Sequence, residues 1–470
     1  MKEQVKKILL LNLPSDIPCY RILHRAKIGD PNYLWPLVDF VCLSGYLAGP
    51  GISLYHKDFQ IDRNDSLDSF LSANKYDLII SSYCPFFEDK DLALLNGIKS
   101  RYPETGIILL ANHKDRLDKQ HTERVLKENS CIQAVVYDYA YNSLSLFIEG
   151  LRGEDVFNVF YLDGGIIKGQ ARDLPRELEI PLPRHEIFKS DSYFHYDSVG
   201  GKMTVAMSTF GCKSGCAFCW APQLYPVISV RTSENMIAEM EHIARCGIDE
   251  VYFHDFSFAL NRKQVLRFCE LMKERNIKLR WFCSSRFDLM SEEVIKAMAE
   301  AGCRCIEFGL ESGNYEVRKL YGKDFPDEKV REVVSLCKKY GIHKSVFVIL
   351  GLPEETLNDM KRSLKFVKRT GFDYIALNIL WAERFTEIAD KLEGSITTDS
   401  SDDAMKRINF THPTVSSGDL VNLYKKSFME IYFSPRFIFR QITGIRSIKK
   451  IRILAYLIKR VLTKTTINNS

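Results

Sequence analysis

Three cysteines stand within eight positions in Gly211-Cys212-Lys213-Ser214-Gly215-Cys216-Ala217-Phe218-Cys219-Trp220. Three thiolates can each bind one iron of a four-iron cubane, which leaves the fourth iron open to a substrate or a cofactor. The glycines of this stretch have no Cβ, so the loop has room to fold around such a bulky group. The spacing therefore predicts one metal cluster with an open position.

A zinc site is the alternative interpretation of the same cysteines. Structural zinc needs four ligands and is commonly held by paired Cys-x-x-Cys units, and no second pair lies near in the sequence. A fourth ligand from elsewhere in the chain would be one of Cys246, Cys283, Cys303 and Cys305. A zinc-stabilised binding protein without catalytic activity therefore remains a second class, and the two classes differ in their metal.

The cysteine stretch follows the first strand of an alternating series of strands and helices. The apolar runs predict strands over residues 204–208, 250–254, 280–284, 305–309, 345–350 and 374–380. Amphipathic patterns predict helices over residues 234–245, 262–274, 291–301, 327–340 and 356–370. Six strand–helix units indicate an open or partial barrel, in which the loops after the strands build the active site.

The N-terminal part shows a similar alternation. Strands are expected over residues 7–11, 52–55, 77–80, 106–110 and 133–136, with helices over 36–47, 89–101 and 121–129. This pattern predicts an α/β fold with a parallel, doubly wound, Rossmann-like sheet. We expect that domain at 1–150, an irregular linker at 151–197, the partial barrel at 198–385 and a helical C-terminal region at 386–470.

Composition places the chain among globular proteins. It has 470 residues, of which 46% are hydrophobic and 27% charged, with a formal net charge of +5 and 13 cysteines. This cysteine content is far below that of a disulfide scaffold, and no secretion signal is evident. We expect a cytoplasmic protein, with membrane association left open, and the small net charge gives no reason to expect nucleic acid as a partner.

The Cys-x-x-x-Cys-x-x-Cys spacing, with Phe218 before the last cysteine, resembles the signature of the radical S-adenosylmethionine (SAM) superfamily. The resemblance covers roughly residues 200–380. It implies that Cys212, Cys216 and Cys219 hold a [4Fe-4S] cluster that reductively cleaves SAM. The residues that it places at SAM are Phe218, His254, Asp255, Ser284, Arg286, Glu311, Ser312, Gly351, Leu352 and Pro353.

The resemblance gives these strand-end residues separate tasks. His254 and Asp255 would lie near the amino end of SAM, although the family's Gly-Gly-Glu form is absent here. Glu311 and Ser312 would approach the ribose and methionine, and the loop that begins at Gly351 would lie against the adenine. Read from the residues alone, Asp255 and Glu311 are equally compatible with helix caps or surface carboxylates, and His254 with a hydrogen-bonded structural role.

A Rossmann-like domain ahead of the barrel resembles the cobalamin-binding subgroup of this superfamily, in which a corrinoid lies between the two domains. Residues 33–37 and 43–47 resemble the subgroup's first helix, and Leu182-Pro183-Arg184 its linker. The sequence has no Asp-x-His-x-x-Gly segment, has Ala111-Asn112-His113 in place of a Gly-Gly-x-His turn, and has Tyr137-Asp138 in place of Gly-Glu. Bulkier residues at these positions restrict the approach of the backbone to a nucleotide tail.

With cobalamin, the implied reaction is methylation of an unactivated carbon: the 5′-deoxyadenosyl radical abstracts hydrogen and methylcobalamin delivers the methyl group. Without cobalamin, the same radical would drive cyclisation, rearrangement or C–S bond formation. The implied partners are a small-molecule or lipid-linked substrate and an electron donor such as flavodoxin or ferredoxin. A methylthiotransferase would need further clustered cysteines, whereas Cys19, Cys42, Cys84 and Cys131 are scattered. The sequence assigns no catalytic acid, base or hydrogen donor.

The C-terminus is basic and amphipathic. From Ile431 to Ser470 there are nine lysines and arginines and no Asp or Glu. The apolar residues at helical spacing are Ile442, Ile445, Ile448, Ile451, Leu454, Leu457, Ile458 and Val461. The pattern predicts a basic amphipathic helix, which is compatible with a helix packed on the barrel, peripheral contact with anionic membranes, or RNA binding.

Overall fold

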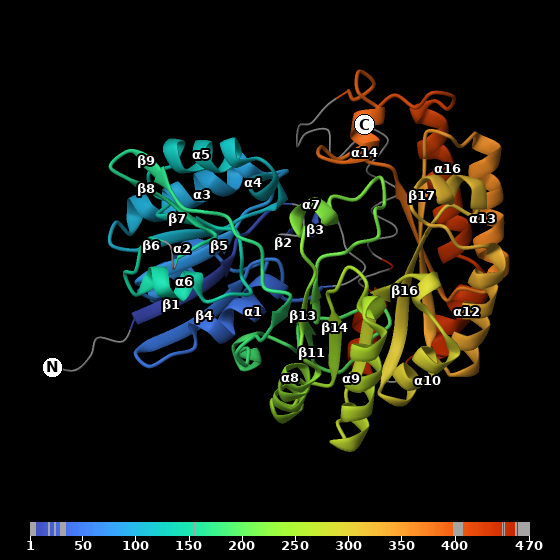
Figure 1. The fold of residues 1–470 in the computed structure, drawn as a ribbon, viewed down its shortest axis with the longest axis horizontal. Helices are drawn as coiled ribbons and strands as arrows, with labels where there is room; N and C mark the ends of the chain where they lie inside the picture. The colour runs from blue at the N-terminus through green and yellow to red at the C-terminus, as the bar shows by residue number, and fades with distance from the viewer. Residues whose placement is uncertain are drawn as a thin grey trace. The chain divides into compact units, whose positions relative to one another are not determined.

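The structure is a computed structural model that describes residues 6–16, 19–22, 25–28, 34–153, 156–397, 408–443, 445, 447–455 and 458. The chain forms two compact units. Unit 1 comprises Met1–Tyr193, Thr204–Met207 and Gln223–Arg231, and unit 2 comprises Phe194–Met203, Ser208–Pro222 and Thr232–Ser470. Both are α/β (Figure 1), as the alternating pattern predicts.

Unit 1 contains a seven-stranded sheet with the order β4-β1-β5-β6-β7-β8-β9. The strands are β1 (Lys6–Asn12), β4 (Ile52–Asp58), β5 (Leu78–Ser82), β6 (Gly106–Leu110), β7 (Ala134–Val136), β8 (Val159–Asp163) and β9 (Ile166–Lys168). The pairs from β4 to β7 are parallel. The central strands are continuous apolar runs because both faces of the sheet are covered.

The order of the five parallel strands is the doubly wound order 2-1-3-4-5. In such sheets the strand order reverses at one point, here between β1 and β5, and ligands bind outside the carboxyl ends of the strands there. The Rossmann-like fold expected from the sequence is thus confirmed, and its topology marks the edge of unit 1 where a cofactor would bind.

The sheet departs from the expected parallel form at its far end. Strand β8 pairs antiparallel with β7, and β8 and β9 form a hairpin. The hairpin turn is at Gly164 and Gly165, which both have positive φ angles, 57° and 82°. The segment that the sequence presents as an irregular linker therefore contributes two strands, which its mostly exposed side chains conceal.

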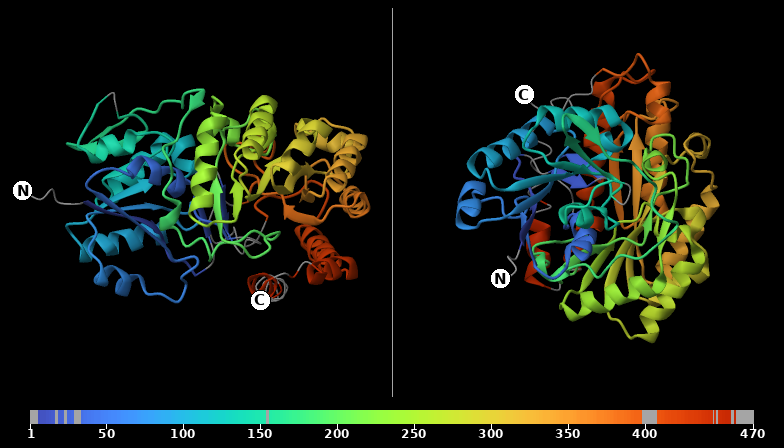
Figure 2. Two further views of the ribbon diagram at one scale, coloured as in Figure 1. Left: turned by 90° about the horizontal axis from the view of Figure 1, so that it is seen from below. Right: turned by 60° about the vertical axis from the view of Figure 1, so that its left-hand side comes forward.

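Helices cover both faces of this sheet (Figure 2). They are α1 (Val38–Leu47), α2 (Leu67–Ala73), α3 (Glu88–Arg101), α4 (His113–Leu117), α5 (Lys119–Glu128) and α6 (Ser143–Ile148). A short hairpin of β2 (Cys19–Ile22) and β3 (Arg25–Ile28) precedes them. Helices α4 and α5 begin at the carboxyl end of the sheet, where Asn112 caps α4 by accepting hydrogen bonds from Lys114 N and Asp115 N.

The second sheet has six strands in sequential order, β11-β14-β15-β16-β17-β18. They are β11 (Met203–Ala206), β14 (Glu250–Phe253), β15 (Arg280–Ser285), β16 (Cys303–Glu311), β17 (His343–Leu350) and β18 (Tyr374–Ile379). The helices that follow are α8 (Ser233–Arg245), α9 (Arg262–Glu274), α10 (Glu292–Glu300), α11 (Tyr315–Leu320), α12 (Asp327–Lys339) and α13 (Leu357–Thr370). The pairs from β14 to β18 are parallel, which confirms the open series of six strand–helix units.

The two faces of this sheet differ in chemistry. On the helix-covered face, Trp281 packs against Phe253 and against Phe268 of α9. On the opposite face, Glu307 accepts hydrogen bonds from Tyr196 and Tyr252 at 2.8 Å each. A polar inner face is expected where a barrel encloses a reaction site rather than a packed apolar core.

Three helices and a helical stretch follow the sheet in the described C-terminal residues. They are α14 (Glu387–Lys391), α16 (Ser417–Tyr432), α17 (Pro435–Thr443) and residues 448–455. The single basic helix expected here is interrupted, because Ile445 is not helical and Ser447 begins a new helix by accepting a hydrogen bond from Lys450 N. Leu457 and Val461 of the predicted pattern lie outside the described residues.

Candidate active site

The three cysteines lie on the loop between β12 (Thr209–Phe210) and α7 (Ala221–Leu224). Each is only partly buried, whereas nine of the other ten cysteines are buried. Gly211 and Gly215 have φ angles of 96° and 57°, so both take the left-handed conformation that the loop needs. The loop therefore presents three accessible thiols, while the remaining cysteines act mainly as core residues.

The spacing of the thiols argues against a single zinc ion. A zinc ion bound at about 2.3 Å by tetrahedral thiolates would bring the sulfur atoms to about 3.8 Å from one another. Among the described residues, the sulfurs of Cys212, Cys216 and Cys219 do not all lie within 4.8 Å of one another. A cubane needs wider spacing because each thiolate binds a different iron, and three partly buried thiols on one loop are the donors that such a cluster uses.

Arg286, at the end of β15, ties the cysteine loop to the sheet. Its Nη1 donates to Cys216 Sγ at 3.7 Å and its Nη2 donates to the carbonyl oxygen of Gly322 at 3.0 Å. Asp288 holds the guanidinium in place with two bonds of 2.9 Å. Burial raises the pKa of the Cys216 thiol, and the positive charge of Arg286 opposes that shift. The same charge lies where a reduced cluster would gain an electron.

Glu311 and Lys323 form a buried ion pair next to this arginine. Lys323 Nζ lies 3.2 Å from Glu311 Oε1, and each side chain is 8% exposed. Burial alone would lower the pKa of Lys323, but Glu311 raises it above its ordinary value, so the lysine stays charged. A Cβ on Gly309 would clash with Glu311 Oε1 and come within 2.6 Å of Lys323 Nζ, so a larger residue there would require both side chains of the pair to move.

Glu311 has a strained backbone. Its φ angle is 67°, a left-handed value that non-glycine residues avoid, at an irregularity in the β16–β17 pairing. This backbone conformation places the Glu311 carboxylate near the cysteine loop, where Lys323 and Arg286 are the neighbouring cations. Paired opposite charges of this kind match the ammonium and carboxylate of an amino-acid group such as the methionine end of SAM.

Asp255 is bonded to the chain just before the cysteine loop. Its carboxylate accepts hydrogen bonds from Ser208 N at 2.8 Å, Thr209 N at 2.5 Å and Ser208 Oγ at 3.0 Å. These bonds fix the chain where it enters the cysteine loop, so Asp255 acts as a positioning residue. His254 is buried beside Tyr252, with ring centroids 5.0 Å apart.

Ser284 belongs to the polar network on the inner face of the sheet. Its hydroxyl donates to Glu307 Oε2 at 3.2 Å and lies 3.0 Å from Tyr252 OH. His195 Nε2 lies 3.1 Å from the other oxygen of the same carboxylate. Ser284 is therefore tied to Glu307, whereas Arg286, two residues later, reaches the cysteine loop.

Ser312 and the loop after β17 form a second group of expected residues. Ser312 Oγ donates to Glu355 Oε1 at 2.6 Å, and burial raises the pKa of Glu355 to about 7. Gly351 takes a φ of 87° and Leu352 offers its carbonyl to His412 Nε2 at 3.1 Å. Leu352 is buried and Pro353 is partly exposed, so only Pro353 of these residues presents side-chain surface.

The structure adds residues that the sequence did not indicate. Lys323 and Asp288 join the charged group at the cluster loop, Glu355 joins Ser312, and Tyr321 lies 6.2 Å from Phe218 between ring centroids. Lys323, Asp288 and Tyr321 stand in no motif, whereas Glu355 belongs to the loop that begins at Gly351. The one available signal was a polar residue shortly after a strand end, and many surface residues share that property.

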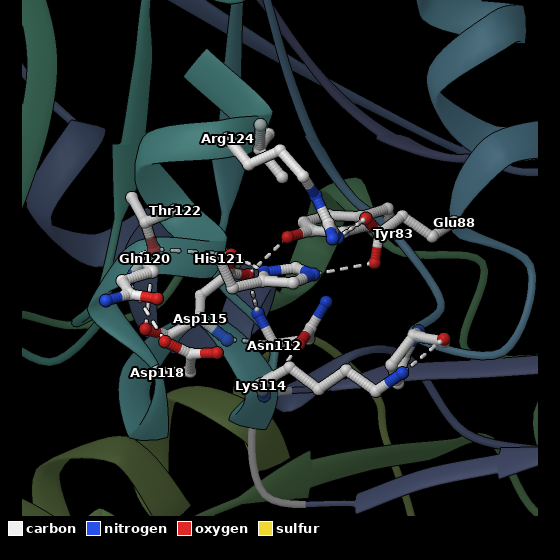
Figure 3. Close-up of polar contacts among 12 residues, drawn as sticks. Tyr83, Glu88, Asn112, Lys114, Asp115, Asp118, Gln120, His121, Thr122 and Arg124 are labelled. Carbon is white, nitrogen blue, oxygen red and sulfur yellow. Dashed lines mark hydrogen bonds and ion pairs between the residues drawn. The ribbon is translucent and has the colours of Figure 1, made fainter. Parts of the chain in front are cut away.

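Unit 1 has its own polar cluster at the carboxyl end of its sheet (Figure 3). His121 Nδ1 lies 2.8 Å from Asp115 Oδ1, and its Nε2 lies 2.8 Å from Glu88 Oε2. Tyr83 donates to the other oxygen of Asp115 at 2.5 Å. Burial alone would lower the pKa of His121, but the bonds to Asp115 and Glu88 raise it to about 9, so this histidine is cationic.

This polar cluster accounts for the bulky residues at positions where the cobalamin-binding subgroup has glycines. Asn112 caps α4, and Tyr137 OH donates to the carbonyl oxygen of Asp115 at 2.7 Å while packing against Phe160. Both ring nitrogens of His121 are occupied by carboxylates, so this histidine has no lone pair for a metal.

Fold and site together define a radical SAM protein. Residues 207–367 match the family described as "Radical SAM superfamily". The protein is a radical SAM enzyme, and the cofactors of that family are a [4Fe-4S] cluster and SAM. The match supports the cluster over zinc.

Known proteins are similar to this chain over most of its length. An uncharacterized methyltransferase of Pyrococcus horikoshii is 27% identical over 339 residues, which are 68% of this chain and 72% of that protein. A tRNA-2-methylthio-N(6)-dimethylallyladenosine synthase of Clostridium botulinum is 24% identical over 341 residues, 69% of this chain and 70% of that protein. The structure of the cobalamin-dependent SAM radical enzyme OxsB, with aqua-cobalamin and SAM bound, has a TM-score of 0.67 and 16% identity, over 97% of this chain and 71% of that one.

Proposed function

We propose that this radical SAM enzyme is a cobalamin-dependent methyltransferase that acts on an unactivated carbon. The observation that carries the proposal is the doubly wound 2-1-3-4-5 sheet ahead of the radical SAM sheet, in a chain whose fold resembles OxsB over 97% of its length. The relative named as a methyltransferase supports the reaction class.

Unit 2 supplies the residues for the first half of the reaction. When bound, the cluster supplies one electron to the sulfonium of SAM, which breaks the C5′–S bond and gives methionine and a 5′-deoxyadenosyl radical. Cys212, Cys216 and Cys219 would hold the cluster. Glu311 would accept from the ammonium of SAM and Lys323 would donate to its carboxylate, because these charges match and stand beside the cysteine loop.

Unit 1 would hold cobalamin at the carboxyl end of its sheet. The reversal of strand order between β1 and β5 provides the position where doubly wound sheets bind cofactors. The donor set there fits a cobalamin whose cobalt is not bound by His121, since both ring nitrogens of that histidine are engaged. When bound, cobalamin supplies the methyl group that is attached to the substrate carbon.

A methylthiotransferase is the second candidate, because one relative is named as such. That chemistry would need a second cluster, and the cysteines of unit 1 offer no clear site for it. All four are buried, and no three of them bring their sulfurs within 4.8 Å of one another in the described residues. Methyl transfer to carbon is therefore the better-supported reaction.

The test is reconstitution of the full chain without oxygen, using iron, sulfide and hydroxocobalamin, followed by desalting and metal analysis. SAM with a deuterated methyl group and a strong reductant are then added. We expect retained iron and cobalt, and formation of both 5′-deoxyadenosine and S-adenosylhomocysteine. Retained iron with 5′-deoxyadenosine but without cobalt would contradict the cobalamin proposal and would favour the cobalamin-independent reactions.

A matched variant separates the two cofactor sites. Replacing all three cluster cysteines by alanine should abolish iron binding and 5′-deoxyadenosine formation. Cobalt retention should persist, because the proposed cobalamin residues belong to unit 1. If the variant lost cobalt while remaining folded, the assignment of cobalamin to unit 1 would be wrong.

A further inference from the structure

The C-terminal helices expose an unusual amount of apolar surface. Nine of the sixteen large hydrophobic side chains that are exposed in the described structure lie between Met429 and Ile458. Phe439 is 70% exposed, Ile442 60%, Ile448 72% and Ile451 50%. Single exposed apolar residues are common, but a concentration of this kind in one segment marks an interaction surface. No helix of the described residues is long and apolar enough to cross a membrane.

This surface lies on helices whose other faces are anchored in unit 2. In α17, Arg440 pairs with Asp373 at 3.3 Å, and Phe437 packs against Tyr374 and Tyr432. The side chains that point away from these contacts include Phe439 and Ile442, which stand at i and i+3. The helix thus keeps one face against the protein and presents an apolar face outward.

The helical stretch 448–455 repeats this arrangement. Lys450 is buried and its Nζ donates to the carbonyl oxygen of Tyr196 at 2.9 Å, while Ile453 is also buried. Ser447 Oγ donates to the carbonyl oxygen of Val199 at 2.8 Å, which fixes the start of the stretch. Ile448, Ile451 and Ile458 recur at helical spacing and all three are exposed. The inward contacts of Ser447, Lys450 and Ile453 therefore leave these isoleucines on the solvent-exposed side of the helix.

The charge of the segment indicates what covers this surface. From Ile431 to Ser470 the sequence holds nine lysines and arginines and no acidic residue. Arg452, which is exposed, stands next to Ile451. Exposed apolar side chains in a segment whose charged residues are all basic match the interface of an anionic bilayer, where acyl chains take up the apolar groups and phosphates attract the cations.

We propose that the outward faces of α17 and of residues 448–455 form a peripheral attachment surface for anionic lipid membranes. The surface comprises Ile438, Phe439, Ile442, Ile445, Ile448, Ile451 and Ile458. Its position on helices that are anchored to unit 2 means that attachment needs no unfolding of the barrel. An RNA partner would call for aromatic stacking side chains among the charges, whereas six of the seven residues of this surface are isoleucines and only Phe439 is aromatic.

The proposal is tested by flotation of the full chain with vesicles. Vesicles of phosphatidylglycerol and phosphatidylethanolamine are compared with vesicles of phosphatidylcholine alone. We expect binding to the anionic vesicles, with at least about 10-fold weaker binding for the triple variant Phe439→Ser, Ile448→Ser and Ile451→Ser, because apolar burial drives insertion. Added salt should weaken binding without abolishing it.

A matched control uses exposed apolar residues of unit 1. The triple variant Leu151→Ser, Leu162→Ser and Ile166→Ser removes the same kind of surface without touching the C-terminal helices, and it should bind vesicles as the unmodified chain does. Absence of flotation with anionic vesicles would overturn the proposal. It would also be overturned by a concentration-dependent dimer in sedimentation analysis that the C-terminal triple variant abolishes, or by binding to single-stranded RNA that displaces the vesicles.

Discussion

Replacing Glu311 with glutamine removes one charge of the buried ion pair beside the cysteine loop. The partner, Lys323, is 8% exposed and lies near Arg286, so without the carboxylate its buried charge loses the group that stabilises it. Removal of one partner from a buried pair costs about 3–5 kcal/mol of stability. If Glu311 also binds the ammonium of SAM, the affinity for SAM should fall at least about 10-fold, which is about 1.4 kcal/mol.

A second substitution separates the structural effect from the binding effect. The double variant Glu311→Gln, Lys323→Met has no unpaired buried charge, so most of the lost stability should return. Its affinity for SAM should stay low, because both charges that match the amino-acid end of SAM are gone. Stability is measured by denaturant unfolding and affinity by equilibrium binding of SAM to the reconstituted protein.

Lys344→Met is the matched control. Lys344 forms a buried pair with Asp373, with Nζ 2.6 Å from Oδ2 and side chains 7% and 16% exposed. It stands at the start of β17, at the opposite end from the loop at Gly351. This variant should lose stability and keep SAM affinity. Recovery of SAM affinity together with stability in the Glu311/Lys323 double variant would refute the binding role and leave the pair purely structural.

Three further predictions follow from single contacts. Alanine at any one of Cys212, Cys216 and Cys219 should remove the bound iron and SAM cleavage without unfolding the chain. The control Cys246→Ala should leave both the iron content and SAM cleavage unchanged. Iron analysis and far-UV circular dichroism check this. Asp255→Asn should lower iron occupancy because it weakens three bonds at the entrance of the cysteine loop, while Asp249→Asn, which weakens a comparable bond to Lys202 N, should leave occupancy unchanged. The pKa of His121 is raised from 6.5 to about 9, so its stabilisation of unit 1 should be complete below about pH 6.5 and lost as the pH rises through 9. Denaturant unfolding at a series of pH values measures this loss. A His121→Gln variant whose free energy of unfolding fell with pH as steeply as that of the unmodified chain would contradict it.

The sequence was a good guide to the strands and to the cysteine loop. Buried parallel strands are continuous apolar runs, so 7–11 and 106–110 could be recognised in β1 and β6, and the cysteine spacing is fixed by the geometry of a cluster. Antiparallel strands at a sheet edge lack that signal. The exposed Leu162 and Ile166 of β8 and β9 therefore gave no indication of the hairpin.

The partners of the site residues could not be predicted, because they depend on side-chain direction in three dimensions. Ser284 and Arg286 are two residues apart, yet the serine bonds Glu307 and the arginine reaches Cys216. Lys323 enters the site because Gly322, with a φ of 72°, allows a tight turn after α11 that packs against the backbone of Gly215. No local pattern specifies such an approach between segments more than a hundred residues apart.

The most direct test of the central claim is metal analysis and SAM cleavage on the chain purified and reconstituted without oxygen. A radical SAM enzyme should hold about four irons per chain, bound by three thiolates, and with a strong reductant it should convert SAM to 5′-deoxyadenosine and methionine. This activity should disappear when any one of Cys212, Cys216 and Cys219 is replaced. Stoichiometric zinc in place of iron, together with intact SAM after reduction, would contradict the account.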